Sequence, residues 1–543
     1  MTLTAEALDL AITHWRTVLG PKAVITDPDR LRTRRLNTSE YPERELYALL
    51  RPGSLDDVRQ IIAVARATGA PLHPVSSGRN WGFGSALPVR GPVALVDLAG
   101  MNSIIGVDES LHYAVIEPGV LQGQLSDHLI AHGSRLKLNV TGSGRDTSIV
   151  GNALDRGAGN LGPRIDDVLG LEAVLGNGSV VRTGLWHLSD DPPHGHYYPP
   201  GIGPDLRGLF VQSSFGIVTK MIVRLHRLTE LLEITCEATE PQLPGFIDAL
   251  RLAHDDAVLN GNIRITDGTD QNIRFFHASG DSRWRAQTTV RGTRAMRAEA
   301  ERELIRRLTP LVHRVECFDT ERDRAKARTA EEQHYLQARL NLANGIPSDR
   351  SLKTIAASSG RPVSAEGERR LAPDLDQDRE LPGFLCANVA LPFTGEHVAR
   401  CAATVASAAR QANVQVSRSF AMLAPTAASG FFPLYFDRRD TTQVERAHSF
   451  KEQVLRSLED IHIYPMRMDI DGMTPFLDRH PSDFWDTTAA LKATLDPQGV
   501  ISPGRYSPAP APTPTLDTDT DPPVFQTLLI PDTVGTNQDD PQP

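Results

Sequence analysis

The stretch that decides the fold is PVSSGRNWGFG, residues 74–84. It follows a short apolar run and carries glycines at Gly78, Gly82 and Gly84. Glycine permits positive φ angles and lets backbone N–H groups approach an anion closely. The spacing matches neither GxxxxGK[ST] nor GxGxxG, so this is neither a P-loop nor a Rossmann fingerprint. By itself the pattern fits an ordinary turn as well as a loop that wraps an anion.

The composition is that of a globular protein with several domains. At ~150 residues per domain, 543 residues predict two to four domains. The net charge of −10 argues against a nucleic-acid partner, because a basic surface is missing. The cysteines are widely spaced and form no CxxC pair, which indicates neither a zinc site nor a disulfide framework. They are Cys236, Cys317, Cys386 and Cys401.

The chain shows no targeting or membrane signal. Its first residues lack a basic region followed by an apolar run, and no apolar stretch reaches about 18 residues. We therefore expect a cytoplasmic protein that does not cross a membrane. His187, His194 and His196 occur in or beside a proline-rich loop, where solvated side chains are expected rather than a metal site.

A second glycine-rich stretch covers residues 139–170 and contains seven glycines in 32 residues. Glycine at this density is entropically costly and is typical of backbone that lies against an extended ligand. Around the two stretches, short strands and helices alternate, which predicts an α+β fold. Residues 171–184 predict a β-hairpin with a two-residue turn at Asn177-Gly178.

Other periodic segments predict the remaining elements. Helices are expected at 3–19, 54–69, 121–132, 243–258, 293–308, 395–412 and 444–460, and strands at 46–52, 93–98, 103–108, 113–120, 229–239, 431–437 and 462–470. Residues 507–543 are rich in proline, threonine and aspartate, so a disordered tail is expected there.

Six motifs in order carry a family resemblance. They are PVSSGRNWGFGSALP, VIEPGV, TSIVGNALDRG, LEAVLGNGSVVRTG, GLFVQSSFGIVTK and LDPQGVISPGRY. This order resembles the vanillyl-alcohol oxidase and p-cresol methylhydroxylase family of FAD enzymes over about residues 40–506. The resemblance implies an FAD-binding domain of the p-cresol methylhydroxylase type, made of two α+β halves, and an antiparallel-sheet cap over the flavin ring.

The resemblance also implies domain limits and cofactor contacts. The FAD domain would be 1–225 (core about 40–225), the cap 226–455, and 456–506 would return to the FAD domain before the tail at 507–543. The matching FAD-binding positions are Ser77, Gly78, Arg79, Asn80, Phe83, Gly84, Pro118, Gly119, Ser143, Ser148, Ile149, Gly151, Asn152, Arg156, Gly216, Ile217, Val218 and Arg505. Arg505 would stabilise the anionic reduced flavin. A homodimer is expected by analogy.

The sequence departs from the family where FAD is covalently attached. The cap position of the linking His or Tyr holds Ser429 or Gly430, and the loop position of a linking His holds Asn80. None of these can form that bond. The hypothesis is therefore non-covalent FAD.

The catalytic positions depart as well. Ser143 stands at the place of the family's catalytic Asp, with Asp146 three residues on, and the phenolate clamp maps to Phe83, Tyr464 and Pro465. The predicted catalytic residues are Tyr464, Arg467, Asp146 and Arg505. In a regular strand Tyr464 and Arg467 point to opposite faces, unless a bulge or bend intervenes.

These observations predict an FAD-dependent oxidoreductase that takes hydride from a hydrophobic alcohol or alkyl-aromatic substrate to flavin N5. Oxygen or a redox protein would accept the electrons. Two alternatives stay open, a 2-hydroxy-acid dehydrogenase of the same superfamily and a non-catalytic flavin-binding module.

Overall fold

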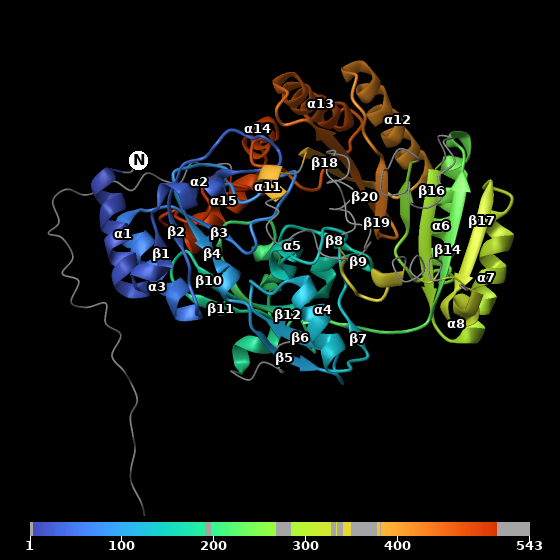
Figure 1. Ribbon diagram of the computed structural model, residues 1–543, viewed down its shortest axis with the longest axis horizontal. Coiled ribbons are helices and arrows are strands. Elements are labelled where there is room, and N and C mark those ends of the chain that lie inside the picture. The colour runs from blue at the N-terminus through green and yellow to red at the C-terminus, as the bar shows by residue number, and fades with distance from the viewer. Residues whose placement is uncertain are drawn as a thin grey trace, which may run out of the picture.

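The computed structural model describes residues 4–189, 197–267, 284–326, 329, 333, 340–348, 377–380 and 382–507. The predicted tail at 507–543 lies outside the described residues, except for Ser507, and so do His194 and His196. The described chain forms two neighbouring sheets with their helices and a third, larger sheet covered by helices on its outer side (Figure 1).

The first sheet has the order β1-β2-β4-β3, in which β2 and β3 run parallel to β4. Helix α3 makes the crossover that parallel strands require. Ser54 Oγ accepts a hydrogen bond from Asp57 N at 3.1 Å at the start of α3, and Gly69 ends it in the left-handed conformation. The elements are α1 (Ala5–Leu19), β1 (Val24–Ile25), α2 (Pro28–Arg35), β2 (Leu46–Leu50), α3 (Leu55–Thr68), β3 (Leu72–Val75) and β4 (Val93–Asp97).

The second sheet is antiparallel and has the order β11-β10-β12-β6-β5. Apolar residues of α4 and α5 pack against it. Its elements are β5 (Ile104–Asp108), β6 (Tyr113–Ile116), α4 (Gln122–Ala131), α5 (Ile149–Leu154), β10 (Val168–Leu175), β11 (Val180–Arg182) and β12 (Gly216–Arg224). Two small pairs lie nearby: β7 (Leu136–Lys137) with β13 (His226–Arg227), and β8 (Ala158–Gly159) with β9 (Gly162–Pro163).

The hairpin of β10 and β11 is confirmed, but its turn is one residue longer than predicted. Leu175 N donates to Ser179 O at 2.8 Å, so the chain turns over residues 176–178. Gly178 takes a φ of 90°, which a side chain would disfavour.

The third sheet has eight antiparallel strands in the order β17-β14-β16-β15-β19-β20-β18-β21. Helices α6, α7, α12 and α13 cover its outer face (Figure 1). The strands are β14 (Leu231–Ala238), β15 (Arg264–Thr266), β16 (Trp284–Arg291), β17 (Arg314–Asp319), β18 (Gly383–Pro392), β19 (Ser419–Ala424), β20 (Ala427–Phe436) and β21 (Tyr464–Pro465). The helices are α6 (Leu243–Asp255), α7 (Arg294–Leu308), α8 (Thr320–Asp323), α11 (Gln377–Glu380), α12 (Gly395–Ala412) and α13 (Thr441–Glu459).

Strand alternation gives this sheet two different faces. On β16, Trp284 and Ala286 are buried in the apolar core beneath the helices. Arg285 and Gln287 line a cavity on the other side of the sheet. Because successive side chains point to opposite faces, the third sheet with its helices, called the cap below, presents polar and aromatic groups to the rest of the chain.

The predicted strand at 462–470 is wrong except at Tyr464–Pro465, the part of this range that pairs with β18. Asp469 Oδ1 accepts hydrogen bonds from the backbone N–H groups of Asp471 and Gly472, at 3.0 and 2.8 Å, which turns the chain toward α14 (Met473–Arg479). After α15 (Asp483–Leu495), Leu72 N of β3 donates to Val500 O at 2.7 Å. The last described residues therefore extend the first sheet.

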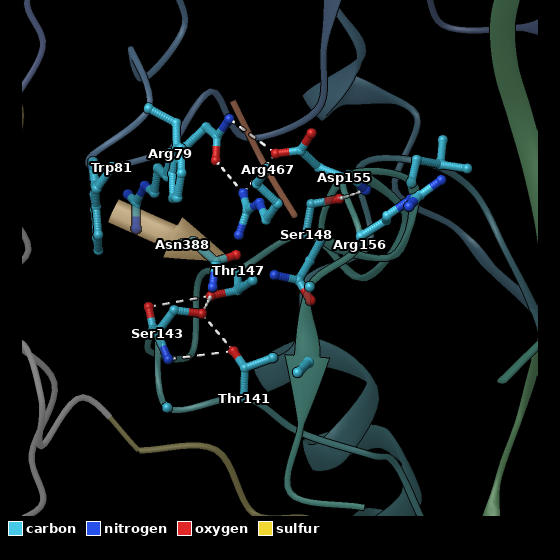
Figure 2. A pocket seen from close by; sticks show the side chains of 18 of the residues that line it. Arg79, Trp81, Thr141, Ser143, Thr147, Ser148, Asp155, Arg156, Asn388 and Arg467 are labelled. Carbon is cyan, nitrogen blue, oxygen red and sulfur yellow. Dashed lines mark hydrogen bonds and ion pairs between the residues drawn. The ribbon is translucent and has the colours of Figure 1, made fainter. Parts of the chain in front are cut away.

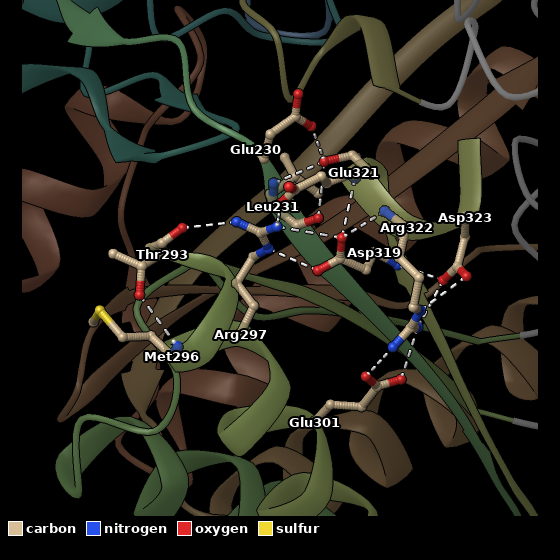
Figure 3. A network of polar contacts seen from close by, with 12 residues as sticks. Glu230, Leu231, Thr293, Met296, Arg297, Glu301, Asp319, Glu321, Arg322 and Asp323 are labelled. Atoms are coloured by element: carbon tan, nitrogen blue, oxygen red, sulfur yellow. Dashed lines mark hydrogen bonds and ion pairs between the residues drawn. The ribbon is translucent and has the colours of Figure 1, made fainter. Parts of the chain in front are cut away.

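An ion-pair network joins α7 to β17 and α8 (Figure 3). The Arg297 side chain is 2% exposed and donates to Asp319 at 2.7 Å and to Glu321 at 2.5 Å. Arg322 pairs with Glu301 and Asp323 beside it. The network secures the outer end of the cap, and these residues do not line the cavity.

Candidate active site

A cavity of about 740 Å³ lies where the glycine-rich loop 76–84, the segment 141–160 and the inner face of the cap sheet meet. The start of β12 and residues 466–470 and 501–505 complete its wall. The cavity is therefore lined by residues from all three large sheets and their connections. Its volume is within the range of small-molecule sites, about 300–1,000 Å³.

Most of the predicted loop residues line this cavity. They are Ser77, Gly78, Arg79, Asn80 and Phe83, together with Ser76 and Trp81. Gly82 has a φ of 81°, and a Cβ there would lie 2.8 Å from the Phe384 ring, so glycine is needed for the loop to meet the cap. Gly84 departs from the prediction because it does not line the cavity. A Cβ there would meet Ile470 at 2.8 Å, so this glycine lets the loop pack on Ile470.

In the segment 141–160 too, some of the predicted residues line the cavity and others pack elsewhere. The predicted residues that line the cavity are Ser143, Ser148, Gly151, Asn152 and Arg156, with Pro118 beside them. Ile149 instead packs in the apolar core against the second sheet. Gly119 lies against backbone, where a Cβ would come within 2.6 Å of Ala99 O. Neither Ile149 nor Gly119 lines the cavity, so both are packing positions in this structure.

Several hydroxyl groups of this segment form hydrogen bonds with other residues of the chain. Ser148 Oγ donates to Pro118 O at 2.9 Å and accepts from Gly151 N at 3.0 Å, so Ser148 caps α5. Ser143 Oγ and Thr147 Oγ1 lie 2.8 Å apart (Figure 2). Gly216, Ile217, Val218 and Arg505, all predicted cofactor positions, line the cavity as well.

The four predicted catalytic residues separate into two pairs. Arg467 and Arg505 line the cavity, whereas Tyr464 and Asp146 do not. Tyr464 is 43% exposed and lies at the surface. Asp146 accepts a hydrogen bond from Arg79 Nη1 at 2.8 Å and does not itself line the cavity. The structure therefore does not bring Tyr464 or Asp146 to the site.

Asp155 is the acidic residue that the sequence reasoning missed. Its carboxylate accepts from Arg467 Nη2 at 2.5 Å, from Arg505 Nη2 at 2.8 Å and from Asn80 Nδ2 at 3.1 Å. Arg467 also donates to Asn80 Oδ1 at 2.7 Å, and its guanidinium lies 4.3 Å from the centre of the Phe83 ring. Asp155 is the acidic residue of the quoted motif TSIVGNALDRG, which was the available signal.

Burial and neighbouring charges shift the pKa values of Asp155, Tyr506 and His73. Burial raises the pKa of Asp155, but Arg467 and Arg505 outweigh it and hold that pKa below its usual value. Burial and the nearby Asp155 raise the pKa of Tyr506 to about 12. Burial and then Arg505 lower the pKa of His73 to about 3. At neutral pH Asp155 is therefore ionised, whereas the side chains of His73 and Tyr506 are neutral.

The cap supplies an aromatic wall and a polar end. The wall comprises Phe384, Phe431 and Tyr435, and the rings of Phe384 and Tyr435 stack at 5.3 Å. Asn388 points into the same space (Figure 2), and its Nδ2 donates to Ser429 Oγ at 2.9 Å. Glu233, Arg264, Arg285 and Gln287 form the polar end.

The residues present fit FAD. Buried polar atoms of cavity-lining residues that find no hydrogen-bond partner among the described residues include Trp81 Nε1, Asn152 Oδ1 and Arg467 Nε. Such atoms are costly unless a ligand or water satisfies them. The glycine-rich backbone allows close approach to a pyrophosphate, and Arg79, Arg156 and Arg505 supply positive charge. A large cofactor with an anionic middle and a flat ring system matches this set.

Neither a metal-binding cluster nor a membrane-spanning helix occurs among the described residues. They contain no group of three or more His, Cys, Asp or Glu side chains placed to hold a metal ion. In the same part of the chain, no helix combines the length and apolarity that crossing a membrane requires.

Comparison with known proteins agrees with this reading. Residues 47–184 match the family model described as an FAD binding domain. The 1'-carboxy-chondrochloren decarboxylase of Chondromyces crocatus is 29% identical over 93% of this chain and 98% of its own length. The 4-cresol dehydrogenase [hydroxylating] flavoprotein subunit of Pseudomonas putida is 31% identical over 46% of this chain and 49% of its own.

Two solved structures share the fold. Substrate-bound p-cresol methylhydroxylase superposes with a TM-score of 0.80 at 21% identity, covering 93% of this chain and 98% of the other. The 4-ethylphenol oxidase of Gulosibacter chungangensis gives 0.81 at 21% identity, covering 94% and 98%. The chain is an FAD-dependent oxidoreductase that carries an FAD binding domain at residues 47–184 and shares the fold of p-cresol methylhydroxylase.

Proposed function

We propose that this chain holds FAD without a covalent bond and removes hydride from a small hydrophobic substrate, an alcohol or an alkyl-substituted aromatic compound. When bound, FAD supplies the ring that accepts the hydride. The observation that carries the proposal is the aromatic wall of Phe384, Phe431 and Tyr435, which lines the same cavity as the loop 76–84. Such a wall favours a substrate with a large apolar surface.

FAD binding and substrate contact would fall to different segments of the chain. Residues 1–225 and 456–506 would hold FAD, and residues 226–455 would supply the wall that contacts the substrate. Non-covalent attachment is supported by Asn80, Ser429 and Gly430, which stand at the family's linking positions. We further propose a cytoplasmic homodimer that passes electrons to oxygen or a redox protein.

The substrate is expected to differ from a simple 4-alkylphenol. A phenolate needs hydrogen-bond donors or a cation at its oxygen, and the family's clamp is altered here. Phe83 has no hydroxyl group, and Tyr464 is turned toward solvent. Arg467, which lines the cavity, is already engaged with Asp155 and Asn80.

A second candidate is oxidation with loss of a carboxyl group. The relative of nearly full length is named a decarboxylase. Alcohol oxidation also calls for a base that takes the hydroxyl proton. The two carboxylates that line the cavity among the described residues, Asp155 and Glu233, both already accept hydrogen bonds from other side chains. Asp155 is held by two guanidinium groups, and Glu233 accepts a hydrogen bond from Gln287.

Oxidative decarboxylation requires no base. The C–C bond to the carboxylate breaks, its electron pair forms a C=C bond with the neighbouring carbon, CO₂ leaves, and that carbon gives up its hydrogen as hydride. Two electrons reach the acceptor, and no proton is removed from the substrate. The arginines at the polar end, Arg264 and Arg285, support a carboxylate-bearing substrate by their charge.

One experiment separates the candidates. The FAD-loaded protein is mixed without oxygen with aryl alcohols, 4-alkylphenols, 2-hydroxy acids and 3-arylpropanoates, and flavin bleaching and CO₂ release are both measured. Bleaching by neutral alcohols or alkyl-aromatics without CO₂ supports the first candidate. Equal amounts of CO₂ and reduced flavin from a carboxylate support the second. Bleaching by none of them would contradict both and favour a flavin-binding module without catalysis.

A further inference from the structure

Asp155 joins three segments that are distant in the sequence. It follows the last turn of α5, while Asn80 comes from the glycine-rich loop and Arg467 and Arg505 come from the C-terminal segment. Its side chain is only 13% exposed. Both of its oxygens accept hydrogen bonds from guanidinium groups, which are stronger than bonds between neutral partners.

Arg467 is fixed by more than Asp155. Its Nη2 also donates to Asn80 Oδ1, and its plane is supported by the Phe83 ring. Its Nε is buried and has no hydrogen-bond partner among the residues that the structure describes, so this donor is available to a molecule in the cavity. Arg505 lines the cavity beside it. Two guanidinium groups and one carboxylate leave this cluster with one net positive charge.

We propose that Asp155 is a positioning residue that holds Arg467 and Arg505 against the flavin and limits their combined charge to one. The inference rests on the proposed function, because it places FAD beside these arginines. Positive charge stabilises the anionic reduced flavin relative to the oxidised form. Asp155 therefore lowers the affinity for reduced FAD relative to oxidised FAD, while it keeps both arginines in place.

The test is the flavin reduction potential of charge variants. Asp155→Asn raises the ratio of the affinities for reduced and oxidised FAD at least tenfold, which is about 30 mV upward for a two-electron couple. Arg467→Gln and Arg505→Gln each shift the ratio at least tenfold downward. The double variant Asp155→Asn/Arg467→Gln restores the net charge and returns within threefold of the wild type.

Controls separate charge from structural damage. Asp319→Asn removes a carboxylate of the cap network, away from the cavity, and leaves the potential unchanged (Figure 3). Asp155→Glu keeps the charge and keeps the ratio of the affinities for reduced and oxidised FAD within threefold of the wild type. If Asp155→Asn does not fold, the Arg467→Gln and Arg505→Gln variants still carry the test.

The outcomes distinguish this inference from the proposed function. A wild-type protein that does not bind FAD would overturn both. A wild-type protein that binds FAD, with potentials in Asp155→Asn or the two arginine variants equal to its own, would overturn the role of Asp155 and its arginines alone. A downward shift in Asp155→Asn would also overturn it.

Discussion

Arg467 Nη2 donates to Asp155 Oδ2 over 2.5 Å, although 312 residues separate the two in sequence. The side chains are 14% and 13% exposed, so both charges are largely removed from water. This contact, with that of Arg505, ties the C-terminal segment to α5 at the cavity.

The first prediction concerns the stability of this cluster. Asp155→Ala leaves two guanidinium groups without their carboxylate, and loss of one partner of a largely buried pair costs about 2–4 kcal/mol. Urea unfolding of the FAD-free protein measures the change. As the matched control, Asp437→Ala removes a carboxylate that pairs with the exposed Arg439, and it leaves the midpoint unchanged. Equal midpoints for Asp155→Ala and the wild type would contradict the prediction.

The second prediction concerns the attachment of FAD. Acid precipitation of the purified protein releases the yellow flavin into the supernatant, because the family's linking positions hold Asn80 and Ser429 or Gly430. Absorbance at the flavin maximum in pellet and supernatant measures this. Flavin that stays in the pellet would show a covalent bond. His73 and Tyr435, whose side chains carry suitable nucleophiles, would then be the first cavity-lining residues to substitute.

The third prediction concerns acid. His73 has a pKa of about 3 in the folded chain, lowered first by burial and then by Arg505, against about 6.5 when unfolded. Between pH 3 and pH 6.5, only the unfolded state binds a proton at His73. The contribution of His73 to the free energy of unfolding is therefore fully present above pH 6.5 and is lost as the pH drops toward 3. The loss from this group is about 2 kcal/mol between pH 6.5 and pH 5.

The variant His73→Gln isolates that contribution, because glutamine does not titrate and can still reach Ser502 Oγ, which lies 3.1 Å from His73 Nδ1. Its free energy of unfolding falls less than that of the wild type over the same pH interval. Parallel pH profiles for the two proteins would show that His73 does not carry the effect.

The fourth prediction concerns a buried amine. Burial and then Arg291 lower the pKa of Lys137 to about 7, below its usual 10.5. The charged form is disfavoured in the folded chain, so the resulting stability penalty is greatest below pH 7 and disappears as the pH rises toward 10.5. Lys137→Met raises the free energy of unfolding at pH 7 by on the order of 2 kcal/mol, after the lost hydrogen bond to Ala343 O is allowed for.

The gain from Lys137→Met is measured by thermal and urea unfolding at pH 7 and pH 10. It shrinks at the higher pH, where the amine is neutral in the folded state and begins to lose its proton in the unfolded state. A variant that is less stable than the wild type at pH 7 would mean that the charged amine is well accommodated.

The sequence was sufficient for elements with strong periodicity. The predicted helix at 395–412 coincides with α12, and the predicted helix at 54–69 encloses α3, whose cap is Ser54. The predicted strand at 462–470 failed because an apolar run does not reveal that the Asp469 carboxylate bonds to the next turn's backbone. The third residue of the hairpin turn at 176–178 was missed because Asn-Gly is typical of shorter turns.

The site was predicted in part. The motif order identified the glycine-rich loop and its companions, which do line the cavity. Gly84, Gly119 and Ile149 belong to the same motifs but serve packing, and a motif does not distinguish the two roles. Asp155 was missed because its role depends on Arg467 and Arg505, which approach it only after the chain has folded.

The central claim is that the cavity holds one FAD, and a titration tests it most directly. FAD is added to FAD-free protein, and binding is measured by calorimetry for the wild type, Gly151→Phe and Gly208→Phe. Gly151 lines the cavity, so a phenyl ring there occupies the space of the cofactor, whereas nothing lies within 4 Å of a Cβ on Gly208, which is outside the lining. We predict one FAD per wild-type chain, a loss of affinity of at least about 100-fold in Gly151→Phe, and wild-type affinity in Gly208→Phe. Wild-type affinity in a folded Gly151→Phe variant, or no binding by the wild type, would contradict the account.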